Sequence, residues 1–214
     1  MKSQVPQEKE SLLLDGPAGK LECLLEIPAN YQNRQVALLC HPHPLYQGTM
    51  HNKVVHTLAR AMHEMGIATL RFNFRGVGLS EGSYAEGNGE TDDTVMLSGW
   101  LRERFPTADL WLAGFSFGGM IAALAAGKTA PAALITIAPA VGMLATESTA
   151  EPAVPWLLVH GADDELVPIA KVLAWADGLV RSPQVVVMPE TSHFFHGQLV
   201  ALRKLLVERL TPSL

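Results

Sequence analysis

The feature that most constrains the fold is a regular alternation of short apolar runs with helix-like segments, from residue 35 to the end of the chain. The apolar runs are almost unbroken, as in strands that are covered on both faces. They span 35–41, 67–74, 109–115, 132–138, 155–161 and 184–190. Helices are predicted between and after them, at 52–66, 91–105, 117–127, 168–180 and 194–210. Such alternation predicts an α/β fold with a mostly parallel central sheet and helices on both faces.

The N-terminal part has a different character. Residues 11–16 and 20–28 are predicted to be two strands joined by the turn "DGPAG", which makes an antiparallel hairpin. The polar residues 1–10 are expected to be a flexible or edge segment. A chain of 214 residues with 48% hydrophobic content can fill one core, so we expect a single domain over 1–214.

Charge and composition exclude several classes of protein. The formal net charge of −5 comes without a lysine or arginine run, which argues against a nucleic-acid partner. The longest apolar stretch, 131–145, is interrupted by proline and glycine and is too short to cross a bilayer, and no secretory signal is visible. We therefore expect a cytoplasmic protein with no membrane partner, in which Cys23 and Cys40 are buried thiols and not a disulfide. The sequence makes no prediction of the oligomeric state.

In open parallel sheets, ligands bind outside the carboxyl ends of the strands. One such end carries "GFSFGG", residues 114–119, where the pattern G-x-S-x-G between strand and helix predicts a nucleophile elbow around Ser116. Gly114 and Gly118 suit this turn because side chains there would collide across it. The amide of Phe117, in the first helical turn, would then face the reacting centre and stabilise developing negative charge.

A serine hydroxyl needs a base to become a nucleophile. The loop after the strand at 155–161 offers Asp163 and Asp164, and the loop after the last strand offers His193 and His196. An imidazole can take the serine proton, and a carboxylate on its other nitrogen fixes its tautomer and orientation. The residues occur in the chain order serine, aspartate, histidine.

These motifs resemble the α/β-hydrolase superfamily over essentially the whole chain from about Ser11. The stretches "GFSFGG", "HGADDELVP" and "TSHFF" carry the resemblance. More narrowly, "CHPHPLYQGTMHNKVV", "LRFNFRGVGLSEGSY" and "LWLAGFSFGG" are similar to a small bacterial group of lidless α/β hydrolases. The resemblance implies the α/β-hydrolase fold without a sizeable lid, since the link at 139–154 is short.

The resemblance also assigns roles. The superfamily pattern D-x-x-V-P fits Asp164 through Pro168, which favours Asp164 over Asp163, and His193 matches the family histidine. His196 is expected in the opening turn of the last helix.

A second oxyanion donor is implied in the loop after the strand at 35–41. In the superfamily this donor is the backbone N–H two residues past a histidine. Prolines replace the usual glycine here, and proline has no N–H to donate. The expected helix length favours the amide of Leu45, with His43 in reserve.

Together these features predict a serine hydrolase that cleaves a carboxylic ester or related acyl bond of a small molecule through an acyl-enzyme. Ser116, Asp164 and His193 form the triad, Phe117 and Leu45 hold the oxyanion, and no cofactor is implied. Alternatives are a serine peptidase or acyltransferase with the same triad, or a binding protein that retains the fold without turnover.

Other signals are weaker. The histidines around "CHPH" lack the spacing of a zinc site, and "GVGLSEG" lacks the third glycine and the helix of a dinucleotide fingerprint, so neither a metal nor a nucleotide is predicted. Arg75 could bind an acidic ligand group or form a salt bridge. Four phenylalanines could line an acyl pocket, although core packing is expected for half of them: Phe115, Phe117, Phe194 and Phe195.

Overall fold

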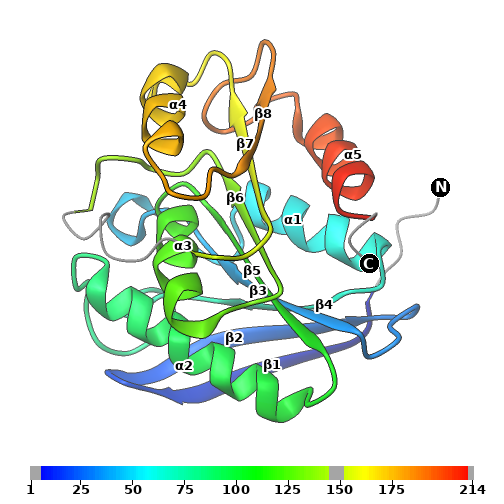
Figure 1. Ribbon diagram of the computed structural model, residues 1–214. Coiled ribbons are helices and arrows are strands. Elements are labelled where there is room, and N and C mark those ends of the chain that lie inside the picture. The colour runs from blue at the N-terminus through cyan, green and yellow to red at the C-terminus, as the bar shows by residue number, and fades with distance from the viewer. Residues whose placement is uncertain (1–5, 145–151, 212–214) are drawn as a thin grey trace.

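The computed structural model describes residues 6–144 and 152–211. Its centre is an eight-stranded sheet with the spatial order β1-β2-β4-β3-β5-β6-β7-β8 (Figure 1). The strands are β1 (Pro6–Gly16), β2 (Gly19–Pro28), β3 (Gln35–Cys40), β4 (Ala68–Phe72), β5 (Asp109–Phe115), β6 (Ala133–Ile137), β7 (Trp156–Gly161) and β8 (Gln184–Met188).

The six strands from β3 onward are parallel to one another, and the predicted hairpin adds an antiparallel pair at one edge. β2 joins that hairpin to the sheet by antiparallel pairing with β4, and β1 is the edge strand. The mostly parallel sheet with an N-terminal hairpin is thus confirmed. Its carboxyl edge gathers loops that lie far apart in the sequence, as expected for this topology.

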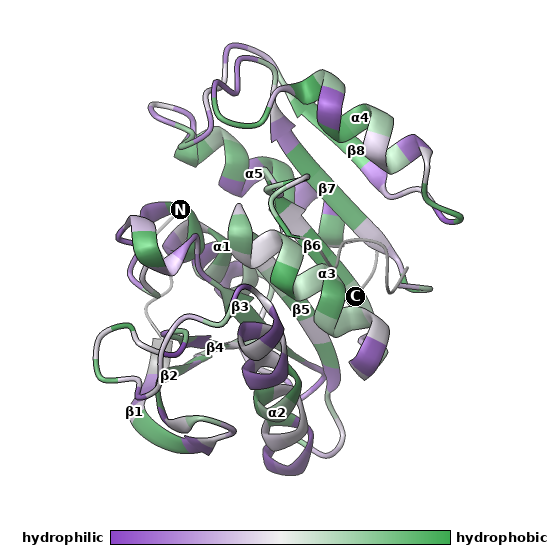
Figure 2. Cartoon of the chain, turned by 90° about the vertical axis from the view of Figure 1, so that its left-hand side faces the viewer, coloured by the Kyte–Doolittle hydropathy of each residue, from purple (hydrophilic) through white to green (hydrophobic). Residues whose placement is uncertain are grey.

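Helices cover both faces of the sheet. They are α1 (Lys53–Glu64), α2 (Asn88–Arg104), α3 (Phe117–Thr129), α4 (Ile169–Asp177) and α5 (Leu199–Leu210), with a short 3₁₀ helix, η1 (Pro44–Tyr46). Apolar residues of α1 and α5 share one core with one face of the sheet, while those of α2, α3 and α4 share a second core on the other. Figure 2 shows the central strands and α3 largely hydrophobic, as two-sided burial requires.

Two helix starts differ by three residues or more from the sequence-based prediction. α2 begins at Asn88 and not at 91, because the Glu90 carboxylate accepts a hydrogen bond from the Gly87 amide and caps the earlier turn. α5 begins at Leu199 and not at 194, because Phe195 and Gly197 both have positive φ, 55° and 73°, which a right-handed helix does not allow. The placement of His196 in the opening turn of that helix was therefore wrong.

The short link between β6 and β7 bears on the predicted absence of a lid. Its described parts, 139–144 and 152–154, contain no helix, and residues 145–151 lie outside the described residues. No helix in the described part of the chain is long and apolar enough to cross a bilayer.

Candidate active site

The turn from β5 to α3 has the geometry of a nucleophile elbow. Ser116 sits at φ 54° and ψ −119°, a strained conformation for a residue with a side chain. Its amide is held by the carbonyl of Ile137 at 2.9 Å. A Cβ on Gly114 would stand 2.1 Å from the Gly118 carbonyl oxygen, and one on Gly118 would stand 2.3 Å from that of His41. The glycines are required because the turn packs directly against backbone.

The structure brings Ser116, His193 and Asp164 together in one hydrogen-bonded chain. Ser116 Oγ lies 3.0 Å from His193 Nε2, and His193 Nδ1 lies 2.7 Å from Asp164 Oδ2. An ionised carboxylate can only accept, so Nδ1 carries the proton and Nε2 is free to accept the serine proton. These groups come from the loops that follow β5, β7 and β8, which meet only through the sheet topology.

Asp164 is well supplied with donors. Oδ1 accepts hydrogen bonds from the amides of Leu166 and Val167, at 3.0 and 2.7 Å. Burial by itself raises the pKa of this carboxyl, but the hydrogen bonds from His193 and the Val167 amide, with the nearby imidazoles, outweigh it and lower the pKa below its ordinary value. The carboxylate therefore stays ionised, as an orienting partner must.

The sequence did not single out His160, which lies against the same carboxylate. This fully buried side chain on β7 places Nε2 2.8 Å from the Val167 carbonyl oxygen and 3.3 Å from Asp164 Oδ2. A carbonyl only accepts, so Nε2 carries the proton, and burial lowers the pKa of His160, which keeps the ring neutral. The 3.3 Å contact with Asp164 is therefore not an ion pair, and the Nε2 proton is donated to the Val167 carbonyl. His160 Nδ1 is the one buried side-chain nitrogen or oxygen of the described residues without a hydrogen-bond partner.

The structure also distinguishes Asp163 from its neighbour Asp164 by burial. Asp163 has an exposed side chain, and its amide bonds to the Thr191 carbonyl at 3.0 Å. Glu165, on the other side, accepts a hydrogen bond from the His193 amide at 3.1 Å and so fixes the histidine loop. No pattern in the sequence marked Glu165, because this contact joins residues 28 positions apart.

The amide of Phe117 opens α3 next to Ser116. Among residues 6–144 and 152–211, no group accepts a hydrogen bond from it, as expected for the first turn of a helix. This N–H is free to bind an anion, and the helix dipole adds to that preference.

Leu45, in contrast, has an occupied amide. It donates to His43 Nδ1 at 3.2 Å, because the His43 side chain caps η1, and the Leu45 side chain is exposed. This contact counts against the prediction that Leu45 supplies the second oxyanion donor. The His43 amide stands two residues after His41, the first residue past β3, and within the described residues it has no hydrogen-bond acceptor. The His43 ring also packs on Phe117, with ring centroids 4.7 Å apart.

The structure also shows the contacts of Arg75 and of the four phenylalanines whose roles the sequence left open. Arg75 forms a salt bridge with Asp93 at 2.6 Å, and that carboxylate is fully buried. Three of the four phenylalanines lie in the core, whereas Phe194 is 42% exposed and packs its ring 5.1 Å from that of His193. In the described ranges, no group of three His, Cys, Asp or Glu side chains could hold a metal ion.

Comparison with known proteins agrees with this fold. The hydrolase family described as serine aminopeptidase, S33, matches residues 33–149, more than half of the chain. The chain belongs to the α/β serine hydrolases. A solved α/β serine hydrolase without lid from Xanthomonas campestris is 42% identical, with a TM-score of 0.92, and the match covers 99% of this chain and 97% of that one.

Two further relatives extend the comparison. An α/β serine hydrolase homologue from Coxiella burnetii is 44% identical at a TM-score of 0.89, covering 94% of this chain and 97% of that one. An uncharacterized protein from Rickettsia prowazekii is 42% identical over 112 residues, 52% of this chain. The matched part spans only 47% of that relative's length.

Proposed function

We propose that this serine hydrolase cleaves a carboxylic ester of a small molecule through an acyl-enzyme, with Ser116, His193 and Asp164 as the triad. The observation that carries the proposal is the continuous hydrogen-bond chain from Ser116 Oγ through His193 to Asp164, at 3.0 and 2.7 Å. The positive φ of Ser116 supports the proposal further, because an incidental loop serine would not need this strained conformation.

In the first half-reaction, Ser116 Oγ bonds to the substrate carbonyl carbon while its proton passes to His193 Nε2. The carbonyl oxygen becomes an oxyanion, which the amides of Phe117 and His43 bind. Collapse of the tetrahedral intermediate breaks the bond to the alcohol oxygen, which takes the proton from His193. Asp164 stabilises the imidazolium throughout by accepting from Nδ1.

In the second half-reaction, a water molecule replaces the alcohol. His193 Nε2 takes a proton from this water, whose oxygen attacks the acyl carbon of the ester on Ser116. The second tetrahedral intermediate uses the same two amides, and its collapse returns the proton to Ser116 Oγ and releases the carboxylic acid.

The choice of His43 as second donor rests on two contacts. The Leu45 amide is already engaged by a side chain, and the His43 ring lies on Phe117, which brings the His43 backbone beside the elbow. Each such donor typically lowers the barrier by about 3 kcal/mol.

Labelling with a fluorophosphonate tests this proposal. The purified protein should be labelled at Ser116, and Ser116→Ala should abolish both labelling and the hydrolysis of p-nitrophenyl acetate. Absence of labelling in the folded wild-type protein would instead favour the alternative of a binding protein without turnover.

A peptidase on the same triad is the second candidate, because the matching family is described as serine aminopeptidase. A panel of short esters, thioesters and aminoacyl arylamides separates the two. Faster turnover of arylamides than of esters would overturn the ester assignment while leaving the triad in place.

A further inference from the structure

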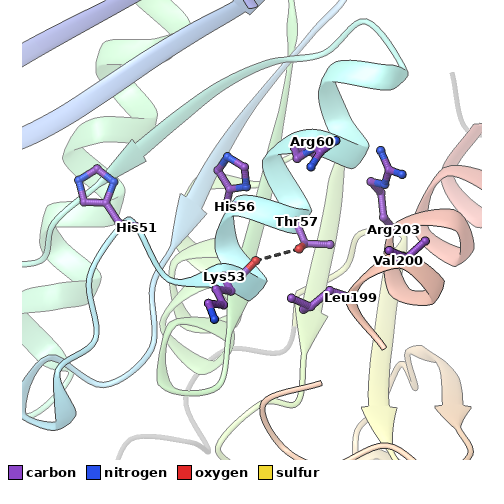
Figure 3. A pocket seen from close by; sticks show the side chains of 8 residues that line it. All are labelled: His51, Lys53, His56, Thr57, Arg60, Leu199, Val200 and Arg203. Carbon is purple, nitrogen blue, oxygen red and sulfur yellow. Dashed lines mark hydrogen bonds between the residues drawn. The ribbon is translucent and has the colours of Figure 1, made fainter. Parts of the chain in front are cut away.

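The strongest unassigned feature of the described residues is a cavity of about 340 Å³ between α1 and α5. Figure 3 shows its lining, which comes from α1, from the loop before it and from the start of α5. We call this cavity the basic pocket, because five of its eight lining residues have basic side chains: His51, Lys53, His56, Arg60 and Arg203. None of the eight is acidic.

Of the three cations in the pocket, Lys53, Arg60 and Arg203, two are not neutralised within the described part of the protein. Arg203 is paired with Glu64, but no carboxylate in the described part of the chain pairs with Lys53 or Arg60. The chain as a whole has a formal net charge of −5, so this local excess runs against the overall charge. Like charges that share a cavity repel one another, and a bound anion would relieve that repulsion.

A second cavity of about 340 Å³ adjoins the basic pocket and extends to Phe194, the neighbour of His193. The two cavities share His51, Lys53 and Leu199, and the second is also lined by Phe194 and His196. Phe194 packs its ring directly against that of His193. A ligand that spans both cavities would therefore run from Phe194, beside His193, to Lys53 and Arg60.

We propose that the basic pocket binds an anionic group, a carboxylate or a phosphate, at the far end of the ester substrate. This inference rests on the proposed function and narrows its substrate class to esters that carry a negative charge. Arg60 offers a planar fork of donors that suits either anion, and Lys53 offers a compact charge at the passage between the two cavities. The apolar walls of Phe194 and Leu199 suit the hydrocarbon between ester and anion.

A matched pair of substrate series tests the proposal. One series consists of p-nitrophenyl monoesters of dicarboxylic acids of increasing chain length, and the other of neutral esters of the same lengths. We expect kcat/KM of the wild-type protein to favour the charged ester at one length. Arg60→Gln and Lys53→Gln should each lower the charged-to-neutral ratio of kcat/KM about tenfold. Lys204→Gln, which removes an exposed charge from α5 outside the pocket, is the control and should leave the ratio unchanged.

Binding of inorganic phosphate to the Ser116→Ala protein separates this inference from the catalytic one. We expect phosphate to bind, to be displaced by a dicarboxylate, and to bind about tenfold more weakly after an added Arg60→Gln change, whether or not any ester is hydrolysed. Equal ratios in Arg60→Gln, Lys53→Gln and wild type would overturn the substrate role even if phosphate binds. If Lys204→Gln lowered the charged-to-neutral ratio of kcat/KM as much as Arg60→Gln does, the preference would come from general surface charge, and the proposed role of the basic pocket would also be overturned.

Discussion

Replacing Asp164 by asparagine probes the site with a change of a single atom. The carboxylate accepts three hydrogen bonds: Oδ1 from two backbone amides at 3.0 and 2.7 Å, and Oδ2 from His193 at 2.7 Å, while the neutral His160 Nε2 lies 3.3 Å from Oδ2. Asparagine has only one side-chain oxygen, and we expect this oxygen to accept the hydrogen bonds of the two fixed backbone amides, from Leu166 and Val167. Its NH₂ group must then face His193 Nδ1.

This arrangement reverses the tautomer of His193. An NH₂ group donates, so Nδ1 must accept, and the ring proton moves to Nε2. Nε2 then donates toward Ser116 and can no longer take its proton. The same NH₂ group also faces the N–H of His160, which adds a repulsive contact. Loss of the correct tautomer in such a triad costs about 10⁴-fold in kcat, or about 5 kcal/mol of barrier.

The assay is steady-state hydrolysis of p-nitrophenyl acetate together with the rate of fluorophosphonate labelling. KM should change little, because Asp164 does not contact the substrate, and circular dichroism should show a native fold. Asp163→Asn is the matched control: its side chain is exposed, so we expect kcat within about twofold of wild type. If Asp164→Asn retained a tenth or more of the wild-type kcat, or if Asp163→Asn lost as much, the reasoning would be refuted.

Two further substitutions test the surroundings of the triad. Gly118→Ala would place a Cβ 2.3 Å from the backbone carbonyl oxygen of His41. We expect this substitution to lower Tm and to abolish labelling by the fluorophosphonate. A variant that is still labelled and has an unchanged Tm would show that the turn can shift to accommodate the Cβ. His160→Leu removes the N–H that binds the Val167 carbonyl and lies 3.3 Å from Asp164 Oδ2, so kcat should fall about tenfold at unchanged KM, and Tm should also fall because a buried carbonyl loses its donor. His160→Gln, which can keep an N–H toward the same acceptors, should recover part of the lost kcat; equal loss in both variants would contradict a role for that hydrogen bond.

The sequence predicted those features that depend on local pattern. Apolar runs alternating with helical segments fixed the parallel sheet, because strands in such an order have few ways to pair. The glycines of "GFSFGG" predicted the elbow around Ser116, since residues within one tight turn constrain each other directly. The order of serine, aspartate and histidine at successive strand ends marked the edge of the sheet at which the three side chains now meet.

The tertiary structure decided what depends on contacts between distant segments. The proposed preference for His43 over Leu45 rests in part on the packing of the His43 ring against Phe117, which begins the helix after a different strand. The hydrogen bond from the His193 amide to Glu165 joins residues 28 positions apart, and the basic pocket joins α1 to α5 across more than a hundred residues. Periodicity reports which face of an element is buried, but not which side chain from another element meets it there. That pairing is fixed only when the sheet order and the packing of helices on it place both elements in space.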